Sequence, residues 1–184
     1  MARTPSNVFA KGAQAPDFRL PDTVSDSQLS LQKVKGEKGT VVMFICNHCP
    51  FVLHVNDELV RLANEYQSQG IGFVAISSND VENYPQDGPE LMKLQAQKVG
   101  YSFPYLYDES QEVAKAYDAA CTPDLYVFDG NLASVYHGQL DDSRPGNGIP
   151  VTGESMRAVL QSLVDGTKYN GPEKPSIGCN IKWK

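Results

Sequence analysis

The most informative segment of this 184-residue chain reads Thr40-Val41-Val42-Met43-Phe44-Ile45-Cys46-Asn47-His48-Cys49-Pro50. Residues 40–45 form a continuous apolar run rich in β-branched side chains, which is typical of a strand buried on both faces. After Pro50, apolar residues recur at steps of three and four: Val52, Val55, Leu59, Leu62 and Tyr66. That spacing predicts an amphipathic helix ending near Gly70, and a second buried strand follows at 71–77. The two cysteines therefore lie at the strand-to-helix junction of a βαβ unit.

The remainder of the chain predicts further elements of an α/β fold. Short strands near 17–20 and 28–31, joined by a polar turn, predict a β-hairpin in an N-terminal extension over 1–38. Helices are expected at 89–100, at 108–117 after a capping box of Asp108 and Gln111, and at 153–165. Extended segments are expected at 104–107, 125–129 and 132–137. The expected architecture is a central mixed β-sheet flanked by helices, in a single domain over 1–184. A tail at 166–184 carries the lone Trp183, which predicts that this tail docks on the domain.

Composition argues against several classes of function. Hydrophobic residues make up 41% of the chain and charged residues 21%, as in ordinary globular proteins. The net charge is −6 and no run of Lys or Arg occurs, which argues against nucleic acid and anionic membranes as partners. The first residues lack the apolar region of a secretory signal, and no stretch approaches the ~20 apolar residues of a membrane span. We therefore expect a cytoplasmic protein, in which structural disulfides are rare.

The Cys46–Cys49 pair carries the chemistry that this sequence predicts most clearly. The thiolate is the reactive form of cysteine, and unsatisfied N–H groups at a helix N-terminus lower the pKa of a thiol. Cys46, where the strand ends, is therefore the expected nucleophile, and Cys49 is the expected resolving thiol. A cationic His48 would further stabilise the Cys46 thiolate and make the disulfide a better oxidant. Asn47 and His48 are accordingly predicted to support the pair.

Other uses of the two thiols stay open from the residues alone. One CxxC is half of a zinc site, and the other half is usually a second CxxC or a His pair. Cys121 and Cys179 lie far apart in the sequence and do not have that spacing. A zinc or iron–sulfur site and purely structural thiols are thus the alternatives to redox chemistry. We expect neither a metal nor a cofactor.

The order of these elements resembles the thioredoxin fold. A βαβ unit with CxxC is followed by Thr122-Pro123, then by a hairpin and a final helix. The resemblance implies that Pro123 is cis and packs against the cysteine pair, with Thr122 backbone groups available to a bound extended chain. A closer resemblance is to the peroxiredoxin-like subgroup of the alkyl hydroperoxide reductase/thiol-specific antioxidant (redoxin) superfamily. The stretches that carry it are 46–52, 75–80, 87–90, 138–148 and 175–184.

The resemblance implies a thiol–disulfide oxidoreductase, with two alternatives. Ile45 replaces the Trp of thioredoxins, and Asn47-His48 replaces their Gly-Pro. Peroxiredoxins carry Thr three residues before the peroxidatic Cys, and in this alignment Cys49 is that Cys and Cys46 replaces the Thr. In a thiol-dependent peroxidase either Cys49 or Cys46 would be peroxidatic. Arg144 would then be the pocket arginine, or else a solvated loop residue. The second alternative is a non-catalytic thioredoxin-fold binding module. The implied partners are a thioredoxin- or glutathione-type electron donor and a disulfide protein or peroxide substrate, and the oligomeric state stays undetermined.

Five further residues are candidates for the site. Cys121 precedes the proline loop and is either a third redox thiol or a small buried hydrophobe. Cys179 would resolve a disulfide if the tail folds back, and otherwise is inert. Asn79, Asp80 and Tyr84 follow the second strand of the βαβ unit, where ligands of open α/β sheets bind, and would shape substrate access. For Asn79 and Asp80 the competing interpretation is turn formation.

Overall fold

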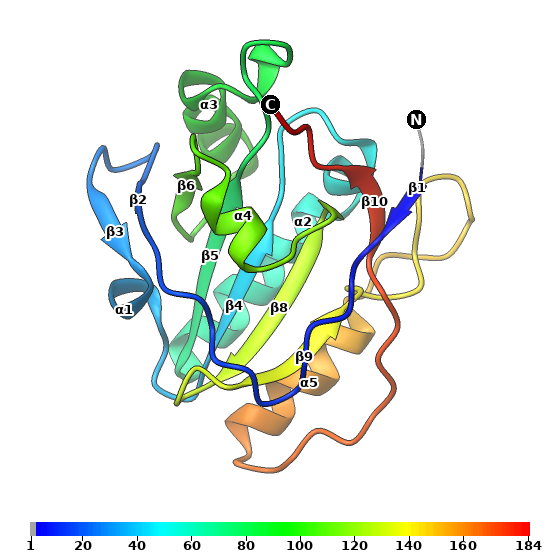
Figure 1. The fold of residues 1–184 in the computed structure, drawn as a ribbon. Helices are drawn as coiled ribbons and strands as arrows, with labels where there is room; N and C mark the ends of the chain where they lie inside the picture. The colour runs from blue at the N-terminus through cyan, green and yellow to red at the C-terminus, as the bar shows by residue number, and fades with distance from the viewer. Residues whose placement is uncertain (1–2) are drawn as a thin grey trace.

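A five-stranded mixed sheet forms the centre of the protein in the computed structural model, which describes residues 3–184 (Figure 1). Its strand order is β6-β5-β4-β8-β9. The strands are β4 (Gly39–Phe44), β5 (Ile71–Ser77), β6 (Tyr105–Tyr107), β8 (Asp124–Asp129) and β9 (Ser134–Gly138). β4 and β5 are parallel, as are β5 and β6, whereas β8 runs antiparallel to β4 and β9 antiparallel to β8. The α/β class and the mixed sheet are confirmed.

Helices cover both faces of this sheet because β4 is apolar on both of its faces. Val41 and Met43 belong to one buried cluster, which includes residues of α2, α3 and α5. Val42 and Phe44 belong to a second cluster with residues of α1, α4 and the N-terminal segment, since successive side chains of a strand point to opposite faces. The helices are α1 (Leu31–Val34), α2 (Pro50–Tyr66), α3 (Pro89–Val99), α4 (Glu112–Ala116) and α5 (Glu154–Val164), with 3₁₀ turns η1 (Gln67–Gln69) and η2 (Pro85–Asp87).

The start of α4 differs from the prediction. The helix begins after Gln111, which has a left-handed backbone with a φ of 65°. Asp108 lies further upstream, and its carboxylate accepts hydrogen bonds from the Ala114 amide at 3.0 Å and the Ser78 hydroxyl at 2.8 Å. The expected capping box was therefore wrong, because Gln111 is the N-cap of α4 and its side chain donates to the Ser78 and Lys182 carbonyl oxygens. The Asp108 carboxylate still binds the first turn of the helix, through the Ala114 amide.

The N-terminal hairpin is confirmed, and it extends the edge of the sheet. β2 (Arg19–Pro21) pairs antiparallel with β3 (Gln28–Ser30). Asp22 follows β2 and its carboxylate accepts a hydrogen bond from the Tyr105 amide at 3.0 Å. This contact fastens the hairpin to β6.

The C-terminal tail packs on the domain through its backbone. β10 (Ile177–Asn180) lies between β1 (Arg3–Pro5) and β7 (Cys121–Thr122) in a small antiparallel sheet, where the two ends of the chain run side by side (Figure 1). Ile181 is 1% exposed, whereas Trp183 is 44% exposed. The tail docks as expected, but strand pairing and Ile181 hold it rather than Trp183.

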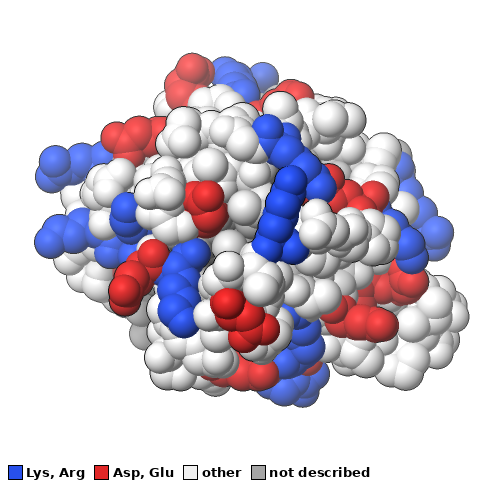
Figure 2. All heavy atoms as spheres, turned by 90° about the horizontal axis from the view of Figure 1, so that it is seen from below, with Lys and Arg blue, Asp and Glu red and all other residues white. Residues whose placement is uncertain are grey.

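The surface has no single-sign field on the face that Figure 2 shows, where basic and acidic side chains alternate. That distribution agrees with the absence of basic runs in the sequence. Within residues 3–184, no helix combines the length and apolar character needed to cross a bilayer.

Candidate active site

The cysteine motif lies where β4 passes into α2, as predicted, but the two thiols occupy different places from those expected. β4 ends at Phe44 and α2 begins at Pro50, so Cys49 is the N-cap of the helix. Its carbonyl oxygen accepts the first helical hydrogen bond, from the Leu53 amide at 3.0 Å. Cys46 lies three residues before the cap. Both side chains are buried, at 2% exposed for Cys46 and 0% for Cys49.

The electrostatic argument made for Cys46 therefore applies to Cys49. A hydrogen bond from the Cys46 thiol, contacts with Cys179 and Thr122, and the Val52 amide lower the pKa of the Cys49 thiol well below its usual range against the opposing effect of burial. The same bond to Cys49, burial and the charge of Asp87 raise the pKa of Cys46. These opposite directions, together with the N-cap position, favour Cys49 as the thiolate of the pair. The sequence interpretation expected the thiolate on Cys46.

Thr122 contacts both sulfurs of the pair. Its Oγ1 lies 3.4 Å from Cys46 Sγ, and its carbonyl oxygen lies 3.1 Å from Cys49 Sγ, from which it accepts when that thiol is protonated. The Thr122–Pro123 peptide bond is cis, as the resemblance implied. The proline loop therefore packs on the cysteine pair.

The tail occupies the backbone edge beside Thr122. Cys179 is the register partner of Thr122 in the β10–β7 pair, and its Sγ lies 2.8 Å from Cys49 Sγ. A Cβ on Gly178 would lie 1.9 Å from the Thr122 carbonyl oxygen, so only glycine fits there. The expectation that this edge is available to an incoming chain was wrong, because the protein's own tail pairs with it.

Asp87 organises the loop that carries Asn47 and His48, and the sequence interpretation missed it. The carboxylate is fully buried. It accepts a hydrogen bond from the Asn47 amide at 2.8 Å. His48 Nδ1 lies 2.6 Å from Asp87 Oδ2, a contact that is an ion pair when the imidazole is protonated. A positive charge on His48 would thus lie directly against the Asp87 carboxylate. The only signal for Asp87 was its place in the Asp-Gly-Pro turn before a predicted helix.

Three atoms around this loop are able to hold a metal. Cys46 Sγ, His48 Nδ1 and an Asp87 carboxylate oxygen lie within 4.8 Å of one another. These are donor types that zinc accepts. This candidate donor set differs from the one considered from the sequence, because it joins one cysteine of the pair to the neighbouring His–Asp pair and does not include Cys121 or Cys179.

Asn79, Asp80 and Tyr84 lie next to Asp87, and they have different roles. The Asn79 amide donates to Asp87 Oδ2 at 2.9 Å, and its oxygen accepts from the Lys182 amide at 2.8 Å. Asn79 therefore joins the Asp87 loop to the tail. Tyr84 stacks on the His48 ring with centroids 5.8 Å apart. The Asp80 carboxylate instead binds its own turn, through the Glu82 amide and the Asn83 side chain.

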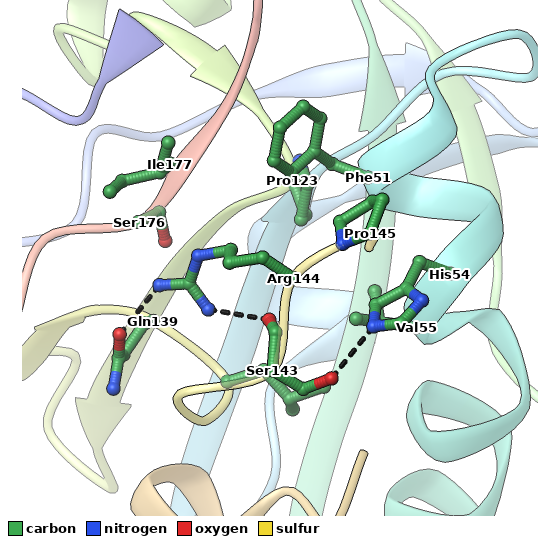
Figure 3. A pocket seen from close by; sticks show the side chains of 11 residues that line it. Phe51, His54, Val55, Pro123, Gln139, Ser143, Arg144, Pro145, Ser176 and Ile177 are labelled. Atoms are coloured by element: carbon green, nitrogen blue, oxygen red, sulfur yellow. Dashed lines mark hydrogen bonds between the residues drawn. The ribbon is translucent and has the colours of Figure 1, made fainter. Parts of the chain in front are cut away.

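Arg144 lines a small pocket together with Phe51, His54 and Pro123 (Figure 3). The pocket volume is about 20 Å³, which is room for about one water molecule. The Arg144 guanidinium donates to the Ser143 carbonyl at 2.7 Å and to Gln139 Oε1 at 2.6 Å. Arg144 is thus neither a solvated loop residue nor in hydrogen-bond contact with the cysteine pair.

Cys121 is completely buried, in the short strand that precedes the cis-proline. Burial and the charge of Asp124 raise the pKa of its thiol. Its Sγ lies 3.7 Å from the Pro123 carbonyl oxygen. Asp124 in turn lies 2.7 Å from His137 Nε2, in a buried pair to which the sequence assigned no role. These surroundings favour the interpretation of Cys121 as a small buried hydrophobe.

The arrangement has counterparts among known proteins. Residues 11–135 match the AhpC/TSA family. The thiol-disulfide oxidoreductase ResA of Halalkalibacterium halodurans is 27% identical over 146 residues, which cover 74% of this chain and 77% of that protein. An uncharacterized conserved protein from Geobacillus kaustophilus is 61% identical and has a TM-score of 0.98, covering 100% of this chain and 97% of the other.

A more distant structure confirms the fold. The thioredoxin domain of a thiol-disulfide oxidoreductase from Bacteroides vulgatus superposes with a TM-score of 0.62 at 18% identity, covering 73% of this chain and 92% of that domain. At that identity the likeness concerns the fold alone.

Proposed function

Because the chain belongs to the AhpC/TSA family and is a thiol–disulfide oxidoreductase, we propose that Cys46 and Cys49 carry its reaction. The observation that supports this most is the position of Cys49 at the N-cap of α2, with Thr122 in contact with the sulfurs of both Cys46 and Cys49. A thiolate held beside a second thiol is ready both to attack a disulfide and to be released from the product.

In this proposal Cys49 attacks and Cys46 resolves. The Cys49 thiolate attacks one sulfur of the substrate disulfide, and the other substrate sulfur leaves as a thiolate that takes up a proton. Cys46 then loses its proton and attacks Cys49 Sγ, which expels the second substrate thiol and forms the Cys46–Cys49 disulfide. The substrate gains two electrons and the pair loses two. The opposite order, with Cys46 attacking, is the one expected from the sequence alone.

The partners follow from the same chemistry. We propose that the substrate is a disulfide-containing protein and that a thioredoxin- or glutathione-type donor reduces the Cys46–Cys49 disulfide. We also propose that the protein works in the cytoplasm, where such donors keep thiols reduced. An antioxidant role would follow if the substrate disulfides arise from oxidative damage.

A trapping experiment tests the proposal and the order of attack. Cys46→Ser and Cys49→Ser are prepared in a Cys179→Ser background, because the Cys179 sulfur touches Cys49. Each reduced variant is mixed with a small aromatic disulfide and analysed by intact mass. We expect a stable mixed disulfide in the Cys46→Ser variant only. An adduct in the Cys49→Ser variant only would show that Cys46 is the attacking cysteine. The absence of an adduct in both variants would refute the proposal. Cys121→Ser serves as the matched control.

A thiol peroxidase is the second candidate, supported by the position of Cys49 at the helix N-terminus. There its thiolate would attack a peroxide oxygen, release an alcohol or water, and become a sulfenic acid. Against this, the Arg144 guanidinium is bound to protein oxygens. Peroxide consumption by the reduced protein, abolished by Cys49→Ser, would support this activity, and its absence would leave disulfide exchange alone.

A further inference from the structure

A third sulfur lies against the cysteine pair. Cys179 is 130 residues from Cys49 in the sequence, yet the two Sγ atoms are 2.8 Å apart and both side chains are buried. The contact depends on strand pairing, because Cys179 is the register partner of Thr122 and Thr122 itself touches Cys49.

The tail that carries Cys179 is held from both sides. β1 pairs with β10 on one edge and β7 pairs on the other. Beyond the strand, the Lys182 carbonyl oxygen accepts hydrogen bonds from the Asp80 amide and from the Gln111 side chain, both at 2.8 Å. Asn79 binds the Lys182 amide. The contact between Cys49 and Cys179 is therefore part of an ordered interface rather than of a loose end.

The tail also has the form of a bound extended peptide. β10 runs antiparallel to β7, which ends at Thr122, the residue before the cis-proline. Gly178 lets the backbone of the tail lie against the Thr122 carbonyl oxygen. The cysteine that follows Gly178 then meets the thiolate at the helix N-cap. A substrate chain that uses the same edge must first displace this strand, since a strand edge pairs with one partner at a time.

We propose that Cys179 is a third redox thiol, which exchanges with the Cys46–Cys49 disulfide and locks the tail over the site. This rests on the proposed function. The Cys179 thiolate attacks Cys49 Sγ, the Cys46–Cys49 bond breaks, and Cys46 leaves as a thiolate that takes up the proton given up by Cys179. The product is a Cys49–Cys179 disulfide. The number of electrons in the protein is unchanged, so the step needs no further oxidant.

The consequence is a gate that depends on redox state. In the dithiol form the tail is held by hydrogen bonds and by burial of Ile181, so it is able to exchange with a substrate chain. After turnover the Cys49–Cys179 bond holds the tail covalently across the peptide edge. The electron donor must then reduce this bond before another disulfide protein gains access.

Disulfide mapping tests the proposal. The full-length wild-type protein and the Cys46→Ser, Cys179→Ser and Cys121→Ser variants are reduced, treated with oxidised glutathione, alkylated, digested and analysed by mass spectrometry. We expect the wild type and Cys121→Ser to yield both Cys46–Cys49 and Cys49–Cys179 peptides. Cys46→Ser should yield Cys49–Cys179 alone, and Cys179→Ser should yield Cys46–Cys49 alone.

Two outcomes separate this inference from the function on which it rests. A folded Cys46→Ser variant that keeps glutathione on Cys49 and forms no Cys49–Cys179 bond would overturn the redox role of Cys179. If the wild type still forms the Cys46–Cys49 disulfide in that case, the proposed function remains intact. Absence of every intramolecular disulfide in the wild type would overturn both. As a second readout, the oxidised Cys179→Ser protein should resume insulin-disulfide reduction after addition of donor severalfold faster than the oxidised wild type, and equal rates would overturn the lock.

Discussion

Replacing Gly178 by alanine tests the close approach of the tail to the proline loop. The added Cβ would lie 1.9 Å from the Thr122 carbonyl oxygen and 2.6 Å from its carbonyl carbon. Both atoms belong to the backbone, so no side-chain rotation relieves the overlap. Real Cβ atoms keep about 3.0 Å or more from such neighbours, and β10 must therefore move by about 1 Å or separate from β7.

The cost can be bounded in two ways. Overpacking in a well-packed region costs about 1–3 kcal/mol, and the upper half applies here because backbone atoms must shift. Release of the tail would instead expose Ile181, whose burial is worth about 1.5–3 kcal/mol. The two routes bound the loss in the free energy of unfolding at about 1.5–3 kcal/mol. For a chain of this length that corresponds to a fall in Tm of roughly 3–12 °C.

Thermal denaturation and thiol labelling of the reduced Gly178→Ala protein measure the effect. We expect the lower Tm together with faster labelling of Cys49, because the strand that covers this thiol is displaced. Asn180→Ala is the matched control, since Asn180 lies in the same strand with an exposed side chain and should change stability by less than about 0.5 kcal/mol. A Gly178→Ala protein with wild-type Tm and labelling would refute the tight pairing of β10 with β7.

Two further predictions concern charge. Asp87→Asn removes a negative charge within 4.8 Å of Cys46 Sγ, so the pKa of Cys46 should fall. A thiolate absorbance titration measures this change, and an unchanged or raised pKa would contradict the role of this charge. The pKa of Cys49 is lowered to about 5, below the ~8.5 of an unfolded thiol, so the folded reduced protein binds fewer protons in that window. The free energy of unfolding of the wild type, relative to that of Cys49→Ser, should therefore rise from about pH 5 to about pH 8.5, and this gain should be lost as the pH falls. Urea titrations of both proteins across this range measure the difference, and a difference that does not change with pH would count against a Cys49 thiolate.

Local pattern was sufficient for the central βαβ unit. The run at 40–45 and the three- and four-residue spacing after Pro50 placed β4, α2 and β5 within a few residues of their observed bounds. Such patterns work because burial acts on each element through its own periodicity. The same reasoning failed at the start of α4, where Gln111 rather than Asp108 is the N-cap and the Gln111 side chain binds the carbonyl oxygens of Ser78 and Lys182.

Within the site, small offsets and distant contacts decided what the sequence left open. The CxxC motif predicted a redox pair, but which of its two cysteines carries the thiolate depends on which one lies at the helix N-terminus. A few residues of loop between Phe44 and Pro50 place Cys49 there. Asp87 was overlooked because an acidic residue in a turn has no distinguishing pattern until it is buried beside His48.

The sequence by itself thus determined an α/β protein with a CxxC pair at a strand-to-helix junction, since hydrophobic periodicity and motif spacing are local properties. Only the tertiary structure showed that Cys49 is the N-cap of α2 and that Cys179 lies against it. The contacts of Cys179 join segments as far as 130 residues apart. Strand pairing of the tail with the proline loop creates those contacts, and no local pattern encodes which edge a short strand will join.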